Sequence, residues 1–239
     1  MLLTTAFFPP VEYFALLAEC STVYVEACER YQKQSWRNRC RILGPNGVQD
    51  LRVPVVHEGG TSSLPIRSIR VDWSTPWLIR FERTLDTAYH SSAWFDDYRA
   101  SLYALLDSRP ETLWDLNART TRWLCDRLGL ATEIRETTVF LPPSGSGIPQ
   151  VLGGPSGGPI PWVPHSAGVP GAGGLLPDYR EILHPKRPNT VLCDRGLDRP
   201  YFQVFSARFG FVPGLSALDL LFNEGPDARS HLLPAGPRG

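Results

Sequence analysis

The chain has 239 residues, with 24 basic and 24 acidic side chains and a formal net charge of +0. This balance gives no long-range attraction for nucleic acid or for an anionic membrane, so any anion that the protein binds must be held locally. No run of about 18 apolar residues occurs, which excludes a typical membrane-spanning helix. The length allows one large domain or two small ones, with a substantial core.

The N-terminus, M-L-L-T-T-A-F-F-P-P, lacks a basic start and ends in two prolines, so it does not resemble a secretory signal. The five cysteines are odd in number, and no two of them form a C-x-x-C pair. This supports neither a disulfide framework nor a zinc site. We therefore expect a cytoplasmic protein with no metal site.

Residues 2–27 have the pattern of a βαβ unit. Residues 2–8 are apolar and rich in strand formers, residues 11–18 carry apolar side chains at helical spacing after Pro10, and residues 22–27 form a second strand-like run. Such a unit has parallel strands, and ligands gather beyond their carboxyl ends. The G-x-G-x-x-G and G-x-x-x-x-G-K-[ST] fingerprints are absent, so no dinucleotide or P-loop nucleotide is indicated.

A cation-rich segment, Y-Q-K-Q-S-W-R-N-R-C-R-I at residues 31–42, follows this unit. Arginine forks and amides suit phosphate or carboxylate, and an indole ring offers a face to a sugar or base. The alternative is a solvated edge strand with its charges facing outward. The candidate binding residues of this segment are Gln32, Lys33, Trp36, Arg37, Asn38 and Arg39.

The next segment predicts a hairpin. Residues 39–43 and 51–56 flank the G-P-N-G turn at residues 44–47, and Asn-Gly favours a tight turn between antiparallel strands. Residues 66–71, I-R-S-I-R-V, alternate as a further strand. With the parallel start, these strands predict a mixed sheet.

Three helices are expected in a helical block at residues 73–130. They cover residues 77–89, opened by the Ser74-Thr75-Pro76 cap, residues 95–106, and residues 113–128, ended by Gly129. The tryptophans of this block are core rather than cofactor contacts on their residue type: Trp77, Trp94, Trp114 and Trp123. Residues 132–141 then read as a strand.

Residues 142–177 change character, because Gly and Pro dominate them. This composition predicts a long loop without regular elements, either a linker or a functional lid. His165 lies within it and is expected to be an ordinary loop residue.

The next segment, D-Y-R-E-I-L-H-P-K-R-P at residues 178–188, is rich in polar and charged side chains. His184 could act as a general acid or base because its ordinary pKa is close to neutrality, or the segment could be a surface run whose charges pair with one another. Residues 201–205 read as a short strand or the start of a helix, and residues 215–222 as a helix. Ser216 and Asp219 share a face of that helix, and Ser216 could be a cap or a catalytic group.

The motifs together resemble the WbqC-like protein family. The matching stretches, in chain order, are F-F-P-P-V-E-Y-F, Y-Q-K-Q-S-W-R-N-R-C-R-I, L-R-V-P-V, A-Y-H-S-S-A-W-F, D-Y-R-E-I-L-H-P-K-R, Y-F-Q-V-F and G-L-S-A-L-D-L-L-F-N-E-G. The D-Y-R and H-P-K block looks like the Bacteroidetes-type branch of the family. The insert at residues 142–177 departs from the family pattern.

The resemblance implies a cytoplasmic role in the assembly of O-antigen or another surface polysaccharide. The first hypothesis is an enzyme that transfers an acyl or aminoacyl group, from a thioester donor, to the amine of a nucleotide-linked amino sugar. Lys33, Arg37 and Arg39 would hold a diphosphate or carboxylate, while Gln32 and Asn38 would bond sugar hydroxyls. A carrier protein could present the donor.

In this hypothesis His184 takes the proton from the attacking amine, and Asp178 or Asp219 orients the imidazole. Cys28 or Cys40 could carry the acyl group, although a buried inert cysteine is the ordinary alternative. The remaining candidate binding residues lie in the later motifs: Tyr89, Arg180, Lys186, Tyr201, Gln203, Ser216 and Asn223.

The second hypothesis is a non-catalytic protein of the same pathway that binds a sugar nucleotide or a partner. Nucleic-acid binding through the arginines is disfavoured by the zero net charge. The expected fold is α/β: a βαβ N-terminal unit, a mixed sheet, a helical block, and one compact domain over residues 1–239 with a long Gly/Pro-rich loop. A separate helical subdomain at residues 73–130 is the alternative.

Overall fold

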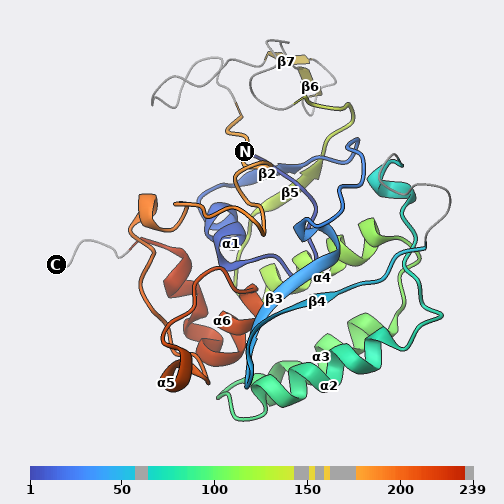
Figure 1. Cartoon of the computed structure of the whole chain (residues 1–239). Helices are drawn as coiled ribbons and strands as arrows, with labels where there is room; N and C mark the ends of the chain where they lie inside the picture. Colours follow the sequence, from blue (N-terminus) through green and yellow to red (C-terminus); the bar gives the residue numbers. More distant parts are fainter. Residues whose placement is uncertain (57–63, 143–150, 154–158, 162–175, 235–239) are drawn as a thin grey trace.

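A computed structural model describes residues 1–56, 64–142, 151–153, 159–161 and 176–234 (Figure 1). The fold is a single α/β domain with a βαβ start, as the sequence predicts. Residues from the parallel sheet, the helical block and the C-terminal helix all contribute to one hydrophobic cluster. Among the described residues, none of the helices has the length and apolar character needed to cross a bilayer.

The βαβ unit is confirmed. β1 (Leu2–Leu3), α1 (Val11–Ala18) and β2 (Thr22–Val25) follow one another, and Leu2 aligns with Tyr24 in a parallel pair. β5 (Glu133–Glu136) pairs in parallel on the other side of β2, which gives the order β1-β2-β5. Both outer strands are shorter than predicted from residues 2–8 and 132–141.

The chain leaves the sheet after Leu3 and turns at Phe8, whose φ of 39° is outside the range of a strand. This conformation is held by Ser216, whose hydroxyl donates to the Phe8 carbonyl at 2.8 Å. The neighbouring backbone is also tied to the C-terminal segment, since Ala217 N–H donates to the Pro9 carbonyl at 2.9 Å. The segment 4–10 thereby sets where α1 begins.

The hairpin is also confirmed, but its second strand begins earlier than predicted. β3 (Arg39–Gly44) pairs antiparallel with β4 (Gly47–Arg52), and Gly47 has a φ of 101°, which favours glycine. The second strand therefore begins at the turn rather than at residue 51. The hairpin is a sheet of its own, so parallel and antiparallel pairing occur in separate sheets.

The strand predicted at residues 66–71 is wrong. Residues 66–68 form the 3₁₀ helix η3 (Ile66–Ser68), and only isolated bridges at Arg70 and Val71 continue the extended pairing. Ile66 and Ile69 are both buried. Their spacing of three residues places both on one side of a 3₁₀ turn, an arrangement that the apparent alternation concealed.

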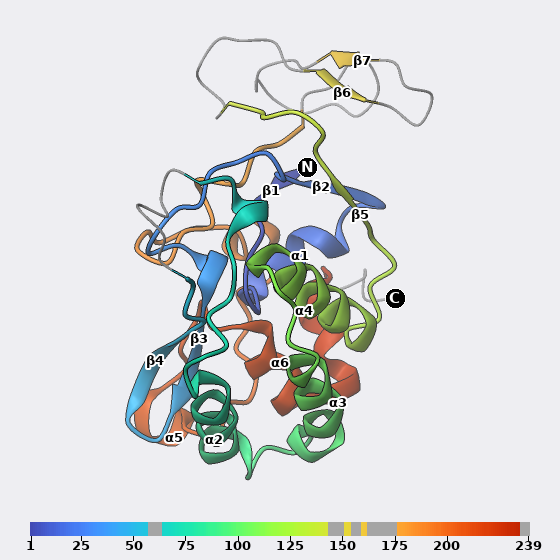
Figure 2. The same ribbon diagram turned by 90° about the vertical axis from the view of Figure 1, so that its right-hand side faces the viewer.

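The three helices of the helical block are confirmed as α2 (Trp77–Tyr89), α3 (Phe95–Asp107) and α4 (Leu113–Arg127). Figure 2 shows α4 between α1 and α3, with α2 beside the hairpin. The expected Ser-Thr cap of α2 is wrong, because Pro76 is the N-cap and Ser74 bonds to Asp72 instead. Of the four tryptophans, only Trp94 is substantially exposed, at 37%.

The Gly/Pro-rich insert contains two short strands, β6 (Val151–Gly153) and β7 (Pro159–Pro161), which pair antiparallel. The prediction of no regular element is therefore wrong for these residues. The rest of the predicted loop or lid lies mostly outside the described residues, and so does His165.

The C-terminal part returns to the core. η4 (Cys193–Arg195) and α5 (Ser206–Phe209) are short, and residues 201–205 form neither the strand nor the helix that was expected. α6 (Ala217–Glu224) and η5 (Gly225–Leu232) pack against α1. Ser216 is the N-cap of α6, with its side chain accepting from Leu218 N–H. The cap that the sequence offered as one role of Ser216 is therefore present.

Candidate functional site

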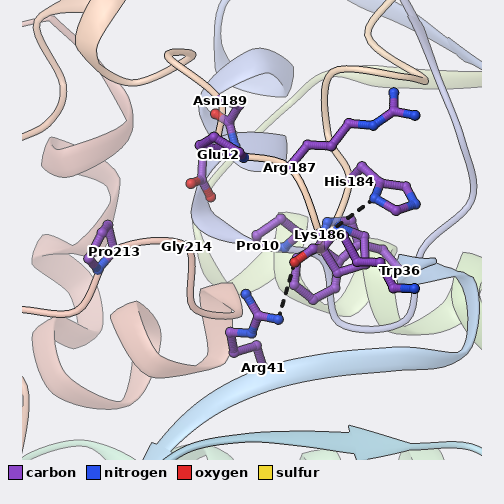
Figure 3. A pocket seen from close by; sticks show the side chains of 12 residues that line it. Pro10, Glu12, Trp36, Arg41, His184, Lys186, Arg187, Asn189, Pro213 and Gly214 are labelled. Carbon is purple, nitrogen blue, oxygen red and sulfur yellow. Dashed lines mark hydrogen bonds between the residues drawn. The ribbon is translucent and has the colours of Figure 1, made fainter. Parts of the chain in front are cut away.

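A cavity of about 370 Å³ opens where four segments distant in sequence converge. The segments are the start of α1, the region from the 3₁₀ helix η1 (Trp36–Asn38) into β3, residues 184–189, and the Pro213-Gly214 turn. Figure 3 shows their side chains around the opening. The principal polar lining residues are Glu12, Arg41, His184, Lys186, Arg187 and Asn189.

The cavity brings together the cation-rich segment at residues 31–42 and the polar block at residues 178–187. The Lys186 ammonium donates to Gln34 Oε1, and Arg41 Nη2 donates to the Pro185 carbonyl at 3.3 Å. The Arg41 guanidinium also lies 5.2 Å from the centre of the Trp36 ring. Two hydrogen bonds thus join two segments that the sequence alone leaves unconnected, and the Arg41–Trp36 contact lies within the first of them.

Positive charge dominates the opening. Arg41, Lys186 and Arg187 all line it, and the only carboxylate among its described lining residues is Glu12. Arg41 is partly neutralised by Asp50 at 3.0 Å, and Arg187 by Glu181 at 3.3 Å. Because Lys186 and Arg187 are exposed, they can turn toward a bound anion at little cost.

His184 is half-buried at one end of the cavity. Its Nδ1 accepts a hydrogen bond from the Lys186 backbone N–H at 3.2 Å, so the neutral ring carries its proton on Nε2. Burial lowers the pKa of His184, and the positive charge of Arg187 lowers this pKa further. A neutral His184 in this conformation donates a hydrogen bond from Nε2 rather than accepting a proton.

Glu12 lies at the other end of the cavity, apart from His184 (Figure 3). It is in the first turn of α1 and only 6% exposed, and its Oε2 has no hydrogen-bond partner among the described residues. Burial raises the pKa of Glu12, although hydrogen bonds, including one to Asn189, and the charge of Arg41 oppose this shift. A buried carboxylate with a free oxygen and a raised pKa is suited to accept a proton.

Asp178 does not contact His184 in any described interaction. It holds Arg180, through Oδ1 to Nε at 2.9 Å and Oδ2 to Nη2 at 2.6 Å. Arg180 also donates to Glu26 at 3.2 Å and to the Pro142 carbonyl at 3.1 Å. This buried network joins the two ends of the Gly/Pro-rich insert, which gives Asp178 and Arg180 a structural role.

Asp219, the other residue expected to orient the imidazole, lies in the first turn of α6 and is 1% exposed. It accepts hydrogen bonds from the hydroxyls of Tyr89 and Tyr201, both at 2.8 Å. Burial raises the pKa of Asp219 to about 6, against the effect of these hydrogen bonds. Asn223 donates to the Asp219 carbonyl at 2.8 Å. Of this group, Tyr201 lines a smaller cavity beside the first.

The arginines expected to hold the substrate are mostly occupied. Arg37 is buried and forms a two-pronged ion pair with Glu29, with Gln32 as a third partner at 3.0 Å. Arg39 pairs with Asp50 at 3.2 Å. These contacts stabilise the loop and the hairpin, and they leave Arg41, the next arginine along β3, at the cavity.

The other predicted binding residues also divide into those with structural partners and those that line a cavity. Asn38 donates to the Val53 carbonyl at 3.0 Å, and Gln203 bonds both N–H and C=O of Val212 at 2.9 Å. Lys33 is exposed and lines a different cavity of about 380 Å³ with Gln32, Arg37 and Arg180. We call the cavity at Glu12 and His184 the main cavity because it joins the segments at residues 31–42 and 178–187. Of the sixteen candidates, the main cavity has three, and these are Trp36, His184 and Lys186.

The cysteines offer no nucleophile at this site. Cys40 is fully buried in β3, where burial raises the pKa of its thiol. Cys28 is exposed, and its thiol donates to the Thr137 carbonyl at 3.8 Å. Neither lines the main cavity. Within the described residues, no group of three or more His, Cys, Asp or Glu side chains could hold a metal ion.

Sequence reasoning missed Glu12, Arg41 and Asn189. Glu12 had a signal, because it is the only charged residue in the otherwise apolar run V-E-Y-F-A-L-L-A that follows the first strand. A lone carboxylate at the start of a buried helix is unusual unless something binds it. Asn189 had no signal, since it stands among ordinary turn residues.

The fold and the cavity define a single-domain α/β protein with a candidate anion site beside the start of α1. The chain belongs to the WbqC-like protein family, which it matches over residues 5–150. It is 27% identical over 228 residues to Uncharacterized protein Rv1507c of Mycobacterium tuberculosis (strain ATCC 25618 / H37Rv), covering 92% of this chain and 91% of that protein. No solved structure matches the chain. The comparisons do not support the Bacteroidetes-type branch.

Proposed function

We propose that the protein transfers an acyl or aminoacyl group from a thioester to the amine of a nucleotide-linked amino sugar, for the assembly of a surface polysaccharide. The observation that carries this proposal is the main cavity, which is lined by three cationic side chains and by a buried carboxylate with a free oxygen. Family membership and the resemblance to O-antigen assembly proteins support the pathway.

The cationic side chains would hold the diphosphate of the acceptor. Arg41, Lys186 and Arg187 supply fork-like and point-charge donors for phosphate oxygens. The half-buried imidazole of His184 would donate from Nε2 to a further oxygen, and Trp36 would present its ring edge to the sugar. The amine of the sugar would then reach Glu12.

The chemical step follows from that placement. The amine nitrogen attacks the thioester carbonyl carbon, the new C–N bond forms, and the C–S bond breaks. The nitrogen loses a proton to the Glu12 carboxylate, and this proton passes on to the departing sulfur, which leaves as a thiol. We assign the base to Glu12 rather than to His184, because Nδ1 of His184 already accepts the Lys186 backbone N–H.

Transfer would be direct, without an acyl-enzyme. No Ser, Thr, Tyr or Cys occurs among the described residues that line the main cavity. A covalent intermediate would need such a nucleophile beside a base. The same observation favours the second function, a non-catalytic protein that binds a sugar nucleotide in this pathway.

Product formation separates the two functions. The purified protein is incubated with UDP-linked amino sugars and a panel of acyl and aminoacyl thioesters, and the N-acylated product is measured by mass spectrometry. Transfer predicts a product with wild type, little product with Glu12→Gln, and full activity with Glu111→Gln, which is exposed on the surface. Binding without any product across the panel would support the non-catalytic function.

A further inference from the structure

A second, narrower cavity of about 130 Å³ lies next to the main one. The two share Glu12, Asn189, Pro213 and Gly214, so these residues form the wall between them. The proposed function does not use this second cavity. Its composition and its position beside Glu12 suggest what it holds.

Apolar side chains make up most of its interior. Val11, Leu192, Leu197 and Phe211 line it, together with the ring of Tyr201. Its acidic and basic side chains are Glu12, Asp198, Arg199 and His231, of which Asp198 and Arg199 are exposed. A surface of this kind favours an apolar guest over a phosphate or a sugar.

The cavity is built on rigid supports. The Tyr201 hydroxyl donates to the buried Asp219 at 2.8 Å, and the Tyr201 ring packs edge-on against Phe211 with centroids 5.2 Å apart. Leu197 is only 2% exposed. Hydrogen bonding and packing therefore hold three of the lining side chains, Tyr201, Phe211 and Leu197, in place.

Glu12 connects the two cavities. Its Oε2 has no hydrogen-bond partner among the described residues, although the side chain is 6% exposed. Gly214 lies beside Glu12, since a Cβ at this position would be in ordinary contact with Glu12 Oε1 at 3.7 Å. Gly214 also has a φ of 72°, a backbone conformation that residues with a Cβ rarely adopt. A polar group bound at Glu12 would have the anion-binding main cavity on one side and the apolar second cavity on the other.

We propose that the second cavity receives the apolar acyl group of the donor and of the N-acylated product, so that one ligand spans both cavities with its amide nitrogen at Glu12. This inference rests on the proposed function, and it names the donor class as a short-chain acyl thioester. An apolar cavity of about 150 Å³ holds a guest the size of benzene. A cavity of 130 Å³ therefore fits an acyl chain of roughly four to six carbons.

The test uses two cysteines that the chain already contains. Cys193 is exposed and lines the second cavity, whereas Cys28 is exposed elsewhere and lines neither of the two cavities. Alkylation of each thiol is followed by mass spectrometry, with and without UDP-glucosamine bearing N-acyl chains of two, four, six or eight carbons. Cys28 serves as the internal control.

The proposal predicts protection of Cys193 but not of Cys28. Affinity should rise about fourfold for each methylene added, until the cavity is filled, and then stop rising. Leu192→Ala, at a half-buried position, should move this limit to a longer chain. The proposal would be overturned if Cys193 were alkylated equally with and without each ligand. An affinity of wild type that does not depend on chain length would also overturn it.

Hexanamide, which lacks sugar and phosphate, separates this proposal from the proposed function. Protection of Cys193 by hexanamide, with no binding of any UDP-linked sugar, would support the apolar subsite and refute the transferase. Acylation of UDP-glucosamine without chain-length dependence and without Cys193 protection would support the transferase and refute the subsite.

Discussion

Most of the cationic residues predicted to bind substrate have a structural role instead. Five of the candidate residues were chosen because they are cationic, yet most of these cations have buried or backbone partners. The sequence shows which side chains could bind an anion but does not show which of them already have a partner. Glu29, the partner of Arg37, was an unremarked residue until the structure placed it.

Glu12→Gln should lower turnover by about 10²–10⁴, the usual contribution of a general base. Because burial raises the pKa of Glu12, wild-type kcat/KM should rise with pH through a range above that of an ordinary glutamate. This pH dependence should disappear in the variant. The rate is measured from pH 4 to 9 beside Glu111→Gln, and an unchanged profile in Glu12→Gln would exclude it as the base.

Arg37→Ala and Arg41→Ala should have opposite consequences. Arg37→Ala leaves the buried Glu29 without its partner, which should cost about 3–5 kcal/mol of unfolding free energy. Arg41→Ala removes a half-buried side chain, so it should weaken binding of a UDP-linked sugar with a much smaller loss of stability. Urea unfolding and calorimetric titration measure the two effects. Loss of binding in Arg37→Ala with loss of stability in Arg41→Ala would instead place the substrate site at Arg37.

At the scale of elements, periodicity predicted the helices well. α1, α2 and α4 begin at the predicted residues because their apolar spacing matches the face that they bury. Strands were less predictable, since β1 ends at Leu3 and the turn that follows at Phe8 is held by Ser216, more than 200 residues away in sequence. A contact at this separation leaves no local signal.

The C-terminal helix α6 should give the protein a pH-dependent stability through Asp219. Burial raises the pKa of Asp219 to about 6, so the folded protein binds more protons than the unfolded chain at intermediate pH. Its stability should therefore fall by about 3 kcal/mol as the pH rises from about 4 to above 6. In Asp219→Asn this part of the pH dependence should vanish, as followed by urea unfolding. An identical slope in both proteins would mean that Asp219 keeps an ordinary pKa.

At the scale of the whole molecule, the buried Arg180 network closes the base of the Gly/Pro-rich insert. Arg180→Met should destabilise the fold by about 3–5 kcal/mol, because Glu26 is fully buried and would lose its charge partner. Arg135→Met, which removes an exposed ion pair on β5, is the matched control and should have little effect. Equal unfolding midpoints for the two variants would show that the network adds little to stability.

The sequence predicted the α/β class, the βαβ start and the helical block, because each rests on local patterns. It indicated that residues 31–42 and 178–187 are chemically rich, but not that they meet. Their meeting depends on the path of the chain after the insert, which no short-range pattern encodes. The sequence therefore predicted three of the residues that line the cavity, Trp36, His184 and Lys186, but not the cavity itself.

Ligand-induced thermal stabilisation tests the central claim, that the cavity between Glu12, Arg41 and the 184–189 segment is the substrate site. UDP-glucosamine at a large excess over its dissociation constant should raise the unfolding temperature of wild type by about 5–10 °C. Arg41→Ala should lose most of this shift, and Arg80→Ala, an exposed arginine on α2, should keep it. A full shift in Arg41→Ala, or its loss in Arg80→Ala, would contradict the assignment of the site.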